Sequence, residues 1–257
     1  FFSTSLIALT GAALLGAAPA IAASDGKHPK QMHWPFDGVL GVQDNVSIQR
    51  GFQVYREVCS ACHGMKRIAF RELEQIGFSE NEIKVLAAEY TVMDGPNDDG
   101  DMFERPARPY DRIPSPYANE KQARAINNGA YPPDMSLIIK ARPDGANYVY
   151  SLLTGYEDAP EGMTLQPGMH YNPYYPGGQI AMAPPLVADG QVTYMDGTEA
   201  TVEQMSKDVV NFLQWAAEPE MELRKKMGLR VMIFLTIMTV FFYIAMKRVW
   251  RPVKEGK

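Results

Sequence analysis

The stretch REVCSACHGMK, residues 56–66, contains both cysteines of this 257-residue chain. Cys59 and Cys62 are three positions apart, and His63 directly follows the second one. Paired cysteines of this kind occur in disulfides, zinc sites, redox pairs and attachment points for larger groups. The rest of the chain indicates which of these applies.

The N-terminal run LIALTGAALLGAAPAIAAS, from Leu6, is apolar and rich in small residues. Its Ala-x-Ala pattern at residues 20–22 is typical of the cleavage site of a secretory signal peptide. We therefore expect residues 1–22 to be a signal peptide that is removed. Export leads to an oxidising compartment, where a disulfide is the default expectation for two lone cysteines.

A second apolar segment lies near the C-terminus, where Val231–Met246 has no charged residue. At about 1.5 Å per residue it covers about 24 Å, and its apolar flanks supply the rest of a roughly 30 Å bilayer core. Arg230 and Lys247 are placed to extend their charges toward the two surfaces. The segment has no polar face, which disfavours a buried helix of a soluble domain.

These two signals predict four regions: a signal peptide at 1–22, an exported domain at 23–223, a membrane anchor at 224–250 and a cytoplasmic tail at 251–257. The formal net charge of −5 is an average over regions of opposite sign. Residues 23–223 carry 29 acidic and 16 basic side chains, whereas residues 224–257 carry 1 acidic and 9 basic ones. The basic end suits anionic lipid headgroups. The acidic domain repels nucleic acid and is suited to steering a basic protein partner, although a solubilising surface explains the charge equally well.

Helical periodicity dominates the exported domain, and sustained strand alternation is absent from the sequence pattern. Helices are predicted within 44–58, 79–90, 119–129, 147–155 and 201–219, with capping boxes at Ser79/Glu82 and Thr201/Gln204 and a cap at Asn119. The 19 prolines and 21 glycines indicate long irregular loops. We therefore predict an all-α domain with extensive irregular structure and one C-terminal transmembrane helix.

The acidic segment MDGPNDDGDMFERPARPYD, residues 93–111, raises the possibility of a calcium loop. Aligning Gly100 with the sixth position of an EF-hand loop places Gly95 at the first ligand position and Pro106 at the twelfth. Neither residue supplies a carboxylate. A solvated acidic loop is the better interpretation.

The cysteine motif is then assigned by its surroundings. A zinc site needs two further ligands at matched spacing, but the other histidines, His28, His33 and His170, are scattered. A thioredoxin-like redox pair follows a strand, whereas a helix is predicted before Cys59. Cys-x-x-Cys-His is the signature of covalent c-type haem attachment, in which the two sulfurs bond to the haem and the histidine is an axial ligand of the iron.

The second axial ligand is less determined by the sequence, because the chain has fifteen methionines. Methionines within or near predicted helices are more often core residues, which applies to Met65, Met135 and Met205. Met182 is the preferred candidate, since it lies in the proline-stiffened segment GGQIAMAPPL. Competing candidates nearby are Met163, Met169 and His170.

Over nearly its whole length after the signal, the chain resembles the cytochrome c1 family, the haem subunits of the ubiquinol–cytochrome c oxidoreductase (cytochrome bc1 complex), in its bacterial form. The resemblance rests on YREVCSACHGMKRIAFREL, on ANEKQARAINNGAYPPDMSLIIKARPDGANYVYSLLTGY, on GMHYNPYYPGGQIAMAPPL and on the C-terminal membrane helix that follows an amphipathic one. The second and third blocks are specific, because small soluble cytochromes c lack them. The resemblance implies a cytochrome c-like haem domain.

The same resemblance implies a set of site residues around one covalently bound haem c. Cys59 and Cys62 hold the haem, and His63 and Met182 are the axial ligands. Arg142 meets a propionate, because a guanidinium satisfies a partly buried carboxylate. The residues implied to line the pocket are Tyr55, Asn127, Pro132, Pro133, Tyr148, Leu152 and Tyr175. Some bacterial relatives carry an extra cysteine pair, which this chain lacks, so the Met182 loop must be held by packing and proline.

The implied function is relay of single electrons from a Rieske iron–sulfur protein to a soluble or tethered cytochrome c, without a catalytic side chain in this chain. The implied partners are cytochrome b, the Rieske subunit, cytochrome c and membrane lipids, and nucleic acid is not expected. The export signal predicts a bacterial cytoplasmic membrane as the location, with the haem domain periplasmic and the C-terminus cytoplasmic. Acidic loops at 94–104 and 157–161 are candidate docking patches for a basic cytochrome c.

The residues alone are also compatible with three other classes of protein. One is a membrane-tethered c-type cytochrome of another oxidase or reductase. A haem peroxidase or ligand sensor with an open sixth site is another. The third is a non-haem anchor with a disulfide.

Overall fold

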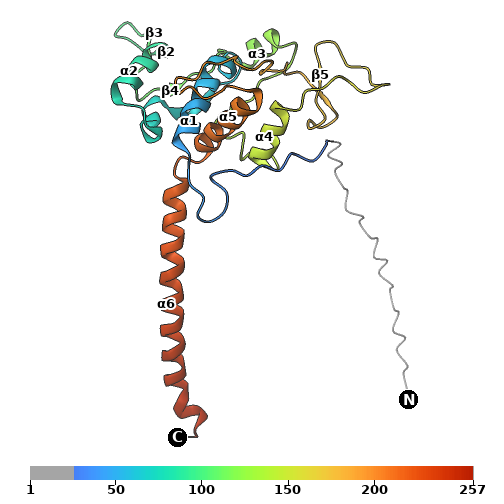
Figure 1. Ribbon diagram of the computed structural model, residues 1–257. Helices are drawn as coiled ribbons and strands as arrows, with labels where there is room; N and C mark the ends of the chain where they lie inside the picture. Colours follow the sequence, from blue (N-terminus) through green and yellow to red (C-terminus); the bar gives the residue numbers. More distant parts are fainter. Residues whose placement is uncertain (1–25, 257) are drawn as a thin grey trace, which may run out of the picture.

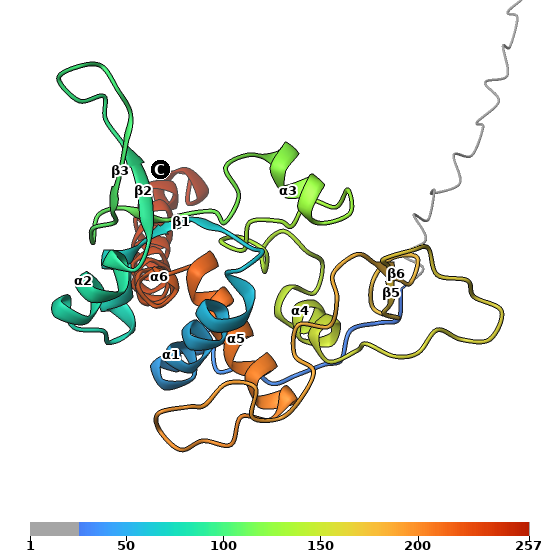
Figure 2. The ribbon, with the colours of Figure 1, turned by 90° about the horizontal axis from the view of Figure 1, so that it is seen from above.

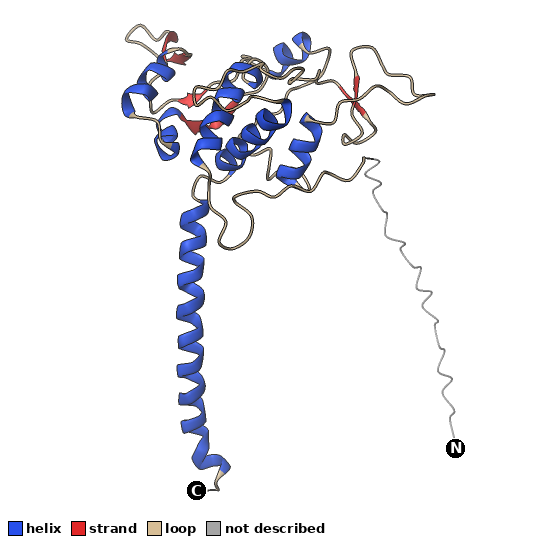
Figure 3. Cartoon of the chain, viewed as in Figure 1, coloured by secondary structure: helices blue, strands red, loops and turns tan. Residues whose placement is uncertain are grey.

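Two helices that are far apart in the sequence, α1 (Asn45–Val54) and α5 (Val202–Ala217), pack against each other at the centre of the domain. The computed structural model describes residues 26–256, and Figure 1 shows a helical domain from which one long helix extends. The predicted signal peptide lies outside the described residues, so it stays a prediction. Figure 3 shows the predominance of helices and loops over strands, which confirms the predicted fold class.

The elements follow one another along the chain with short strands between the helices. The helices are α1, the single π-helical turn η1 (Tyr55–Cys59), the 3₁₀ helix η2 (Phe70–Ile76), α2 (Glu80–Ala88), α3 (Glu120–Ile126), α4 (Gly145–Leu153), α5 and α6 (Met221–Lys254). The strands form three antiparallel two-stranded sheets: β1 (Met65–Ala69) with β4 (Arg112–Ile113), β2 (Thr91–Asp94) with β3 (Phe103–Pro106), and β5 (His170–Tyr171) with β6 (Gln179–Ile180). The acidic segment considered for calcium is the β2–β3 hairpin and the chain after it, with Asp94 paired to Phe103.

Local capping signals explain where the predicted helices begin. Ser79 accepts a hydrogen bond from the backbone N–H of Glu82, and the Glu82 carboxylate accepts one from the Ser79 N–H, which confirms a capping box. Asn119 caps α3 as expected. The capping box at Thr201 is only half correct: the Thr201 hydroxyl accepts from the Gln204 N–H, but the Gln204 side chain donates to Asp208 instead. The buried carboxylate of Asp208 therefore competes successfully for the Gln204 amide.

The core lies between α1 and α5, where a chain of aromatic rings begins next to the cysteine motif. Phe212 of α5 lies 5.4 Å from Phe52 and 5.6 Å from Tyr55, measured between ring centroids, and 5.7 Å from Trp215. All four side chains are buried. Aromatic pairs at such distances add stability beyond the burial of their area, so the helix that carries the cysteine motif is held firmly in place.

Gly51 permits the close approach of α1 to α5. A Cβ atom built on Gly51 would lie 2.0 Å from the Asp208 carbonyl oxygen and 2.8 Å from the Phe212 Cβ. Both neighbouring atoms belong to the rigid part of α5 and have no room to move. Only glycine fits at this crossing.

Replacing Gly51 by alanine is therefore expected to destabilise the domain by about 1–3 kcal/mol or more, since overpacking forces the two helices apart. Thermal unfolding followed by circular dichroism measures this change. Gly228→Ala is the matched control, because a Cβ on this helical glycine meets no atom within 4 Å. Equal melting temperatures for the two variants would contradict the steric explanation.

The helix α6 begins directly after the domain and leaves it at one side (Figure 1). Among residues 26–256 it is the one helix long and apolar enough to cross a membrane, and it confirms the predicted C-terminal transmembrane helix. It starts before and ends after the predicted anchor at 224–250, and it includes Pro252 in its last turns. The rest of the predicted domain boundaries stay predictions.

Candidate functional site

The cysteine motif lies where α1 ends. The helix continues into η1, in which the Ser60 N–H donates to the Tyr55 carbonyl at 2.8 Å. The N–H groups of Cys62 and His63 then both donate to the Cys59 carbonyl, at 3.1 and 2.9 Å. Single π-helical turns of this kind often mark functional sites. This turn places both thiols and the imidazole on one short, hydrogen-bonded segment.

The two cysteines are free thiols, with Cys59 partly buried and Cys62 exposed. Burial raises the pKa of the Cys59 thiol to about 12, and the neighbouring Cys62 adds to this effect. A redox-active cysteine has the opposite property, a lowered pKa that favours the thiolate. Because Cys59 and Cys62 are not bonded to each other, the structure disfavours the disulfide interpretation, and the raised pKa of Cys59 disfavours the redox-pair interpretation.

The imidazole of His63 is oriented by the loop that follows α3. Its Nδ1 lies 2.8 Å from the Pro133 carbonyl oxygen. Because a carbonyl only accepts, Nδ1 carries the proton and the Nε2 lone pair is available to a metal. Burial lowers the pKa of His63, while the Pro133 carbonyl and the charge of Asp134 oppose this effect. The imidazole is therefore neutral, which is the form that binds metals.

Several predicted pocket residues surround this motif. The Tyr55 hydroxyl donates to the His63 carbonyl at 3.0 Å, and burial raises the pKa of Tyr55. Asn127, directly after α3, donates from Nδ2 to the Tyr117 hydroxyl at 2.9 Å, and Tyr117 in turn lies beside Cys62. Tyr55, Asn127 and Pro133 therefore form a first group of predicted pocket residues, which lies around the turn that carries Cys62 and His63.

A second group is built on α4 and the loop before it. Burial raises the pKa of Tyr148, while the charge of Arg142 opposes the shift and Tyr175 adds to it, so the three side chains lie near one another. The carbonyl of Leu152, one helical turn along, accepts a hydrogen bond from Asn172 Nδ2 at 2.8 Å. Arg142 and Tyr175 are exposed, whereas Tyr148 and Leu152 are partly buried.

Met182 follows β6 and is connected to the second group. Its carbonyl accepts a 3.0 Å hydrogen bond from the Tyr156 hydroxyl, and Tyr156 lies near Tyr148. The loop is fixed on both sides of Met182 by the buried side chains of Ile180 and Leu186. Figure 2 traces this loop from β6 past α4 to the start of α5.

The segment after Pro133 connects the two groups. Met135 donates its N–H to the Gly64 carbonyl at 2.8 Å, and Asp134 accepts from the Lys66 N–H at 2.9 Å. The chain then continues through Arg142 into α4. Within each group the structure thus brings the side chains close together, and the backbone from Pro133 to α4 links the two groups. Binding of one iron by His63 and Met182 from opposite sides stays a prediction.

Three further residues organise the site, although the sequence pattern did not single them out. Asn172 is fully buried, and it holds Leu152 through its side chain and the Gly178 carbonyl through its N–H. Tyr156 holds Met182, and Asp134 holds the segment beside His63. Asn172 precedes Pro173 within YNPYYPGG, where a turn signal was available; for the other two the sequence carries no local signal.

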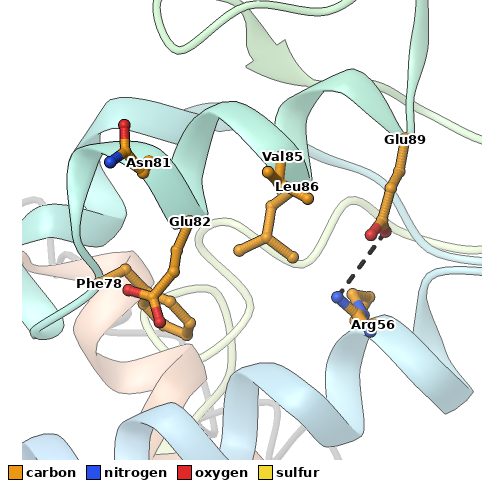
Figure 4. A pocket seen from close by; sticks show the side chains of 7 residues that line it. All are labelled: Arg56, Phe78, Asn81, Glu82, Val85, Leu86 and Glu89. Atoms are coloured by element: carbon orange, nitrogen blue, oxygen red, sulfur yellow. Dashed lines mark ion pairs between the residues drawn. The ribbon is translucent and has the colours of Figure 1, made fainter.

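A shallow groove of about 440 Å³ lies between η1 and α2 (Figure 4). Its apolar part comes from Phe78, Val85 and Leu86, and an ion pair of 3.7 Å joins Arg56 to Glu89. None of the predicted haem-site residues lines it. The groove is therefore separate from the candidate site.

The residues at the site fit a covalently attached haem. Two free thiols and one imidazole with an available Nε2 lie on a single turn. Large apolar side chains in the neighbouring segments remain exposed, as expected beside a site for an apolar group: Ile126, Tyr131, Leu137 and Tyr175. A helical domain with this motif and a transmembrane helix defines a membrane-anchored c-type cytochrome.

Comparison with known families makes the assignment specific. The model of the Cytochrome C1 family matches residues 34–253, and the chain belongs to this family, the haem subunits of the bc1 complex. Members of this family bind one covalent haem c. The predicted resemblance is confirmed.

Individual relatives agree with the family match. "Cytochrome c1 1, heme protein, mitochondrial" of Arabidopsis thaliana is 49% identical over 98% of this chain and 83% of its own length. "Cytochrome c1" of Rhodospirillum rubrum is 49% identical over 86% of this chain and 87% of its own length. "Cytochrome b/c1" of Bradyrhizobium diazoefficiens is 46% identical, and the match covers 93% of this chain and 38% of that protein.

Proposed function

We propose that this chain relays single electrons from a Rieske iron–sulfur protein to a cytochrome c within a ubiquinol–cytochrome c oxidoreductase. The observation that carries the proposal is the turn at the end of α1, where two free thiols lie beside an imidazole whose Nδ1 is held by Pro133. The family match and the relative named "Cytochrome b/c1" support the placement in this complex, with cytochrome b as a neighbour.

The proposed ligands follow from the donor atoms available. Cys59 and Cys62 supply the sulfurs for two thioether bonds, His63 supplies Nε2 and Met182 supplies Sδ. When bound, the haem supplies an iron that accepts and releases one electron, so no side chain has to transfer a proton. A thioether ligand favours a higher potential than a second imidazole does.

The other site residues have positioning and shielding roles in this proposal. The Pro133 carbonyl and the Tyr55 hydroxyl fix the orientation of the His63 segment. Asn127, Pro132, Tyr148, Leu152 and Tyr175 exclude water, which raises the potential of a haem site. Arg142 carries the charge that satisfies a propionate, consistent with its exposed position beside Tyr148.

The proposed location is a bacterial cytoplasmic membrane, with the haem domain on the periplasmic side and the end of α6 in the cytoplasm. The transmembrane helix and the bacterial relatives are consistent with it. The side of the membrane follows from the predicted signal peptide, which lies outside the described residues.

Rapid mixing of the intact, haem-loaded complex tests the relay. After quinol is added, we expect the c-type haem absorbance of this chain to report reduction, and then re-oxidation when oxidised cytochrome c is supplied. The same complex without its Rieske protein should show no reduction by quinol. Reduction that persists without the Rieske protein, or a failure of cytochrome c to re-oxidise the chain, would contradict the proposal.

Electrostatic steering of a basic cytochrome c should make the second of these steps sensitive to salt. The rate should fall as ionic strength rises, because the Debye length shrinks to about 3 Å at 1 M salt. Figures 1 and 2 show that the β2–β3 hairpin and the loop after α4 lie at opposite ends of the domain. The two acidic loops therefore do not form one continuous patch, and only one of them is expected to steer the partner.

Neutralising each loop separately identifies the one that steers. Asp98, Asp99 and Asp101 are exposed on the hairpin, whereas Glu157, Asp158 and Glu161 are exposed after α4. Asp94 is omitted, since it is paired with Arg105. Amide substitutions in one triplet should lower the rate at low salt and flatten its salt dependence, with the other triplet as control. A rate independent of ionic strength in the unsubstituted protein would exclude steering.

Replacing Tyr156 by phenylalanine should loosen the Met182 loop by about 1 kcal/mol, the usual net worth of one hydrogen bond. The reduced protein should then bind carbon monoxide to a greater extent, because the sixth position opens more often. Tyr110→Phe is the control, since this tyrosine is exposed and distant in sequence from the loop. Identical carbon monoxide binding in the two variants would show that the Tyr156 hydroxyl does not hold the loop.

A further inference from the structure

The loop between Pro35 and Val42 is closed by its own backbone. The Val42 N–H donates to the Pro35 carbonyl at 3.0 Å, and the Asp37 N–H donates to the Trp34 carbonyl at 3.1 Å. Gly41 has no room for a side chain, because a Cβ there would lie 2.2 Å from the Asp37 carbonyl oxygen. These contacts give the loop a defined shape.

The base of the loop is anchored in the domain. Phe36 stacks on the buried ring of Trp34, with ring centroids 5.6 Å apart and planes inclined by 9°. The Asp37 carboxylate accepts a 3.0 Å hydrogen bond from the Trp34 N–H. The one carboxylate within the loop is thereby directed back toward its base.

The loop is also attached to the first turns of the transmembrane helix. Lys225 Nζ donates to the carbonyls of Phe36 and Gly41, at 2.7 and 3.0 Å. The Gln43 N–H donates to Glu222 Oε1 at 3.0 Å. The orientation of the loop relative to α6 is therefore determined by several hydrogen bonds.

The tip of this anchored loop is apolar and open to solvent. Val39 is 74% exposed and Leu40 is 84% exposed, although both belong to side-chain types that are usually buried. Figure 1 shows the loop, just before α1, hanging below the domain on the side from which α6 leaves. A rigid loop that presents two large apolar side chains in this direction needs an apolar surface to cover them.

The position of Lys225 along α6 indicates what that surface is. Val231, the first residue of the uncharged stretch, lies six positions after Lys225, which corresponds to about 9 Å along the helix. The headgroup layer on each side of a bilayer is about 5–8 Å thick. Leu40 is one residue and Val39 two residues from Gly41, whose carbonyl Lys225 also binds, so the backbone of the tip lies within about 7 Å of that anchor. This reach extends into the headgroup layer of the bilayer.

We propose that Val39 and Leu40 insert into the interfacial layer of the lipid bilayer on the domain side, as a second membrane contact beside α6. Lipid is the occupant that the structure favours, because the loop is continuous with the transmembrane helix through Lys225. Arg230, directly before the uncharged stretch, adds a positive charge that suits anionic headgroups, whereas Arg224 and Lys226 are paired with Glu218 and Glu222. Two separate contacts with the membrane restrict the tilt of the haem domain, whereas one helix alone permits it.

A spin label at position 40 tests the insertion in the intact complex embedded in lipid nanodiscs. Leu40→Cys is labelled, and the collision rates of the label with molecular oxygen and with a water-soluble nickel chelate are measured by electron paramagnetic resonance. Oxygen concentrates in the bilayer and the chelate in water. Met102→Cys, on the exposed β2–β3 hairpin far from α6 in Figure 1, is the matched aqueous control. The unsubstituted complex, treated in the same way, supplies the background signal.

We expect the ratio of oxygen to nickel collisions to be several times higher at position 40 than at position 102. Equal ratios at the two positions would place the loop in water and overturn the proposal. An immobilised label that neither reagent reaches would also overturn it, since the loop would then be covered by a neighbouring protein subunit. Val39→Cys replaces Leu40→Cys if the latter complex does not assemble, with the same expected and contradicting results.

Discussion

Replacing Met182 by leucine is expected to remove the high reduction potential of the haem-loaded protein. The fall should be on the order of a few hundred millivolts, within the roughly 0.8 V over which axial ligands set haem potentials. Leucine keeps the volume and apolar character of the side chain but has no lone pair to offer the iron. The reduced variant should also bind carbon monoxide readily, because its sixth position is open. Redox titration followed by absorbance measures the first effect, and a carbon monoxide difference spectrum measures the second.

Two other methionines provide matched controls for this substitution. Met163 and Met169 lie in the same region of the chain and are partly buried, as Met182 is. Met163→Leu and Met169→Leu should leave the potential and the carbon monoxide response close to those of the unsubstituted protein. If Met182→Leu kept the high potential and one of the controls lost it, the ligand would be the other methionine.

Replacing Asp208 by alanine is expected to have the largest effect on stability, a loss of about 3–5 kcal/mol. Asp208 is fully buried in α5 and forms an ion pair with Arg50 of α1, with Oδ2 2.9 Å from Nε. Its oxygens also accept hydrogen bonds from Ser47 Oγ at 2.6 Å and from Gln204 Nε2 at 3.0 Å. Alanine leaves all of these donors without their buried acceptor. Removing one partner of a buried ion pair is more costly than replacing both partners by apolar residues, because the remaining charge stays buried without compensation.

Thermal unfolding measures this loss, and a surface ion pair supplies the comparison. Glu80 and Lys84 of α2 are 2.7 Å apart, but both side chains are exposed. Glu80→Ala should therefore change the stability by no more than about 0.5 kcal/mol. Similar melting temperatures for Asp208→Ala and Glu80→Ala would show that the network between α1 and α5 contributes no more than a surface pair. Because α1 leads directly into the cysteine motif, the absorbance changes that report the native axial ligation of the covalently held haem should also occur at a lower temperature in the Asp208→Ala protein.

Interactions between residues close in the sequence were predicted well. The Ser79/Glu82 capping box and the Asn119 cap involve neighbours three residues apart, so their residue types alone determine the hydrogen bonds. The membrane-spanning part of α6 could be predicted from composition, because a run of sixteen uncharged, mostly apolar residues is typical of a segment inside a lipid bilayer. Cys59, Cys62 and His63 lie within five positions of one another, so their placement on one short segment could also be predicted.

Interactions across the chain were predicted only through the family resemblance or not at all. His63 and Pro133 are seventy residues apart, and the hydrogen bond that orients the imidazole leaves no trace in local periodicity. The half-formed capping box at Thr201 shows the same limit, since Gln204 turns to a buried carboxylate on its own helix that is held by Arg50 of α1. The separation of the two acidic loops likewise depends on the folded path of the chain.

The sequence by itself determined the covalent attachment motif, the helical character of the domain and the membrane anchor, because each of these arises from residues within a few turns of one another. The tertiary structure alone decided which backbone groups orient His63 and Met182, through Pro133 and Tyr156. It also decided how closely α1 approaches α5 at Gly51, and that Lys225 fixes an apolar loop beside the membrane helix. These features depend on buried polar groups finding partners and on side chains filling space, and both are settled only when distant segments pack together.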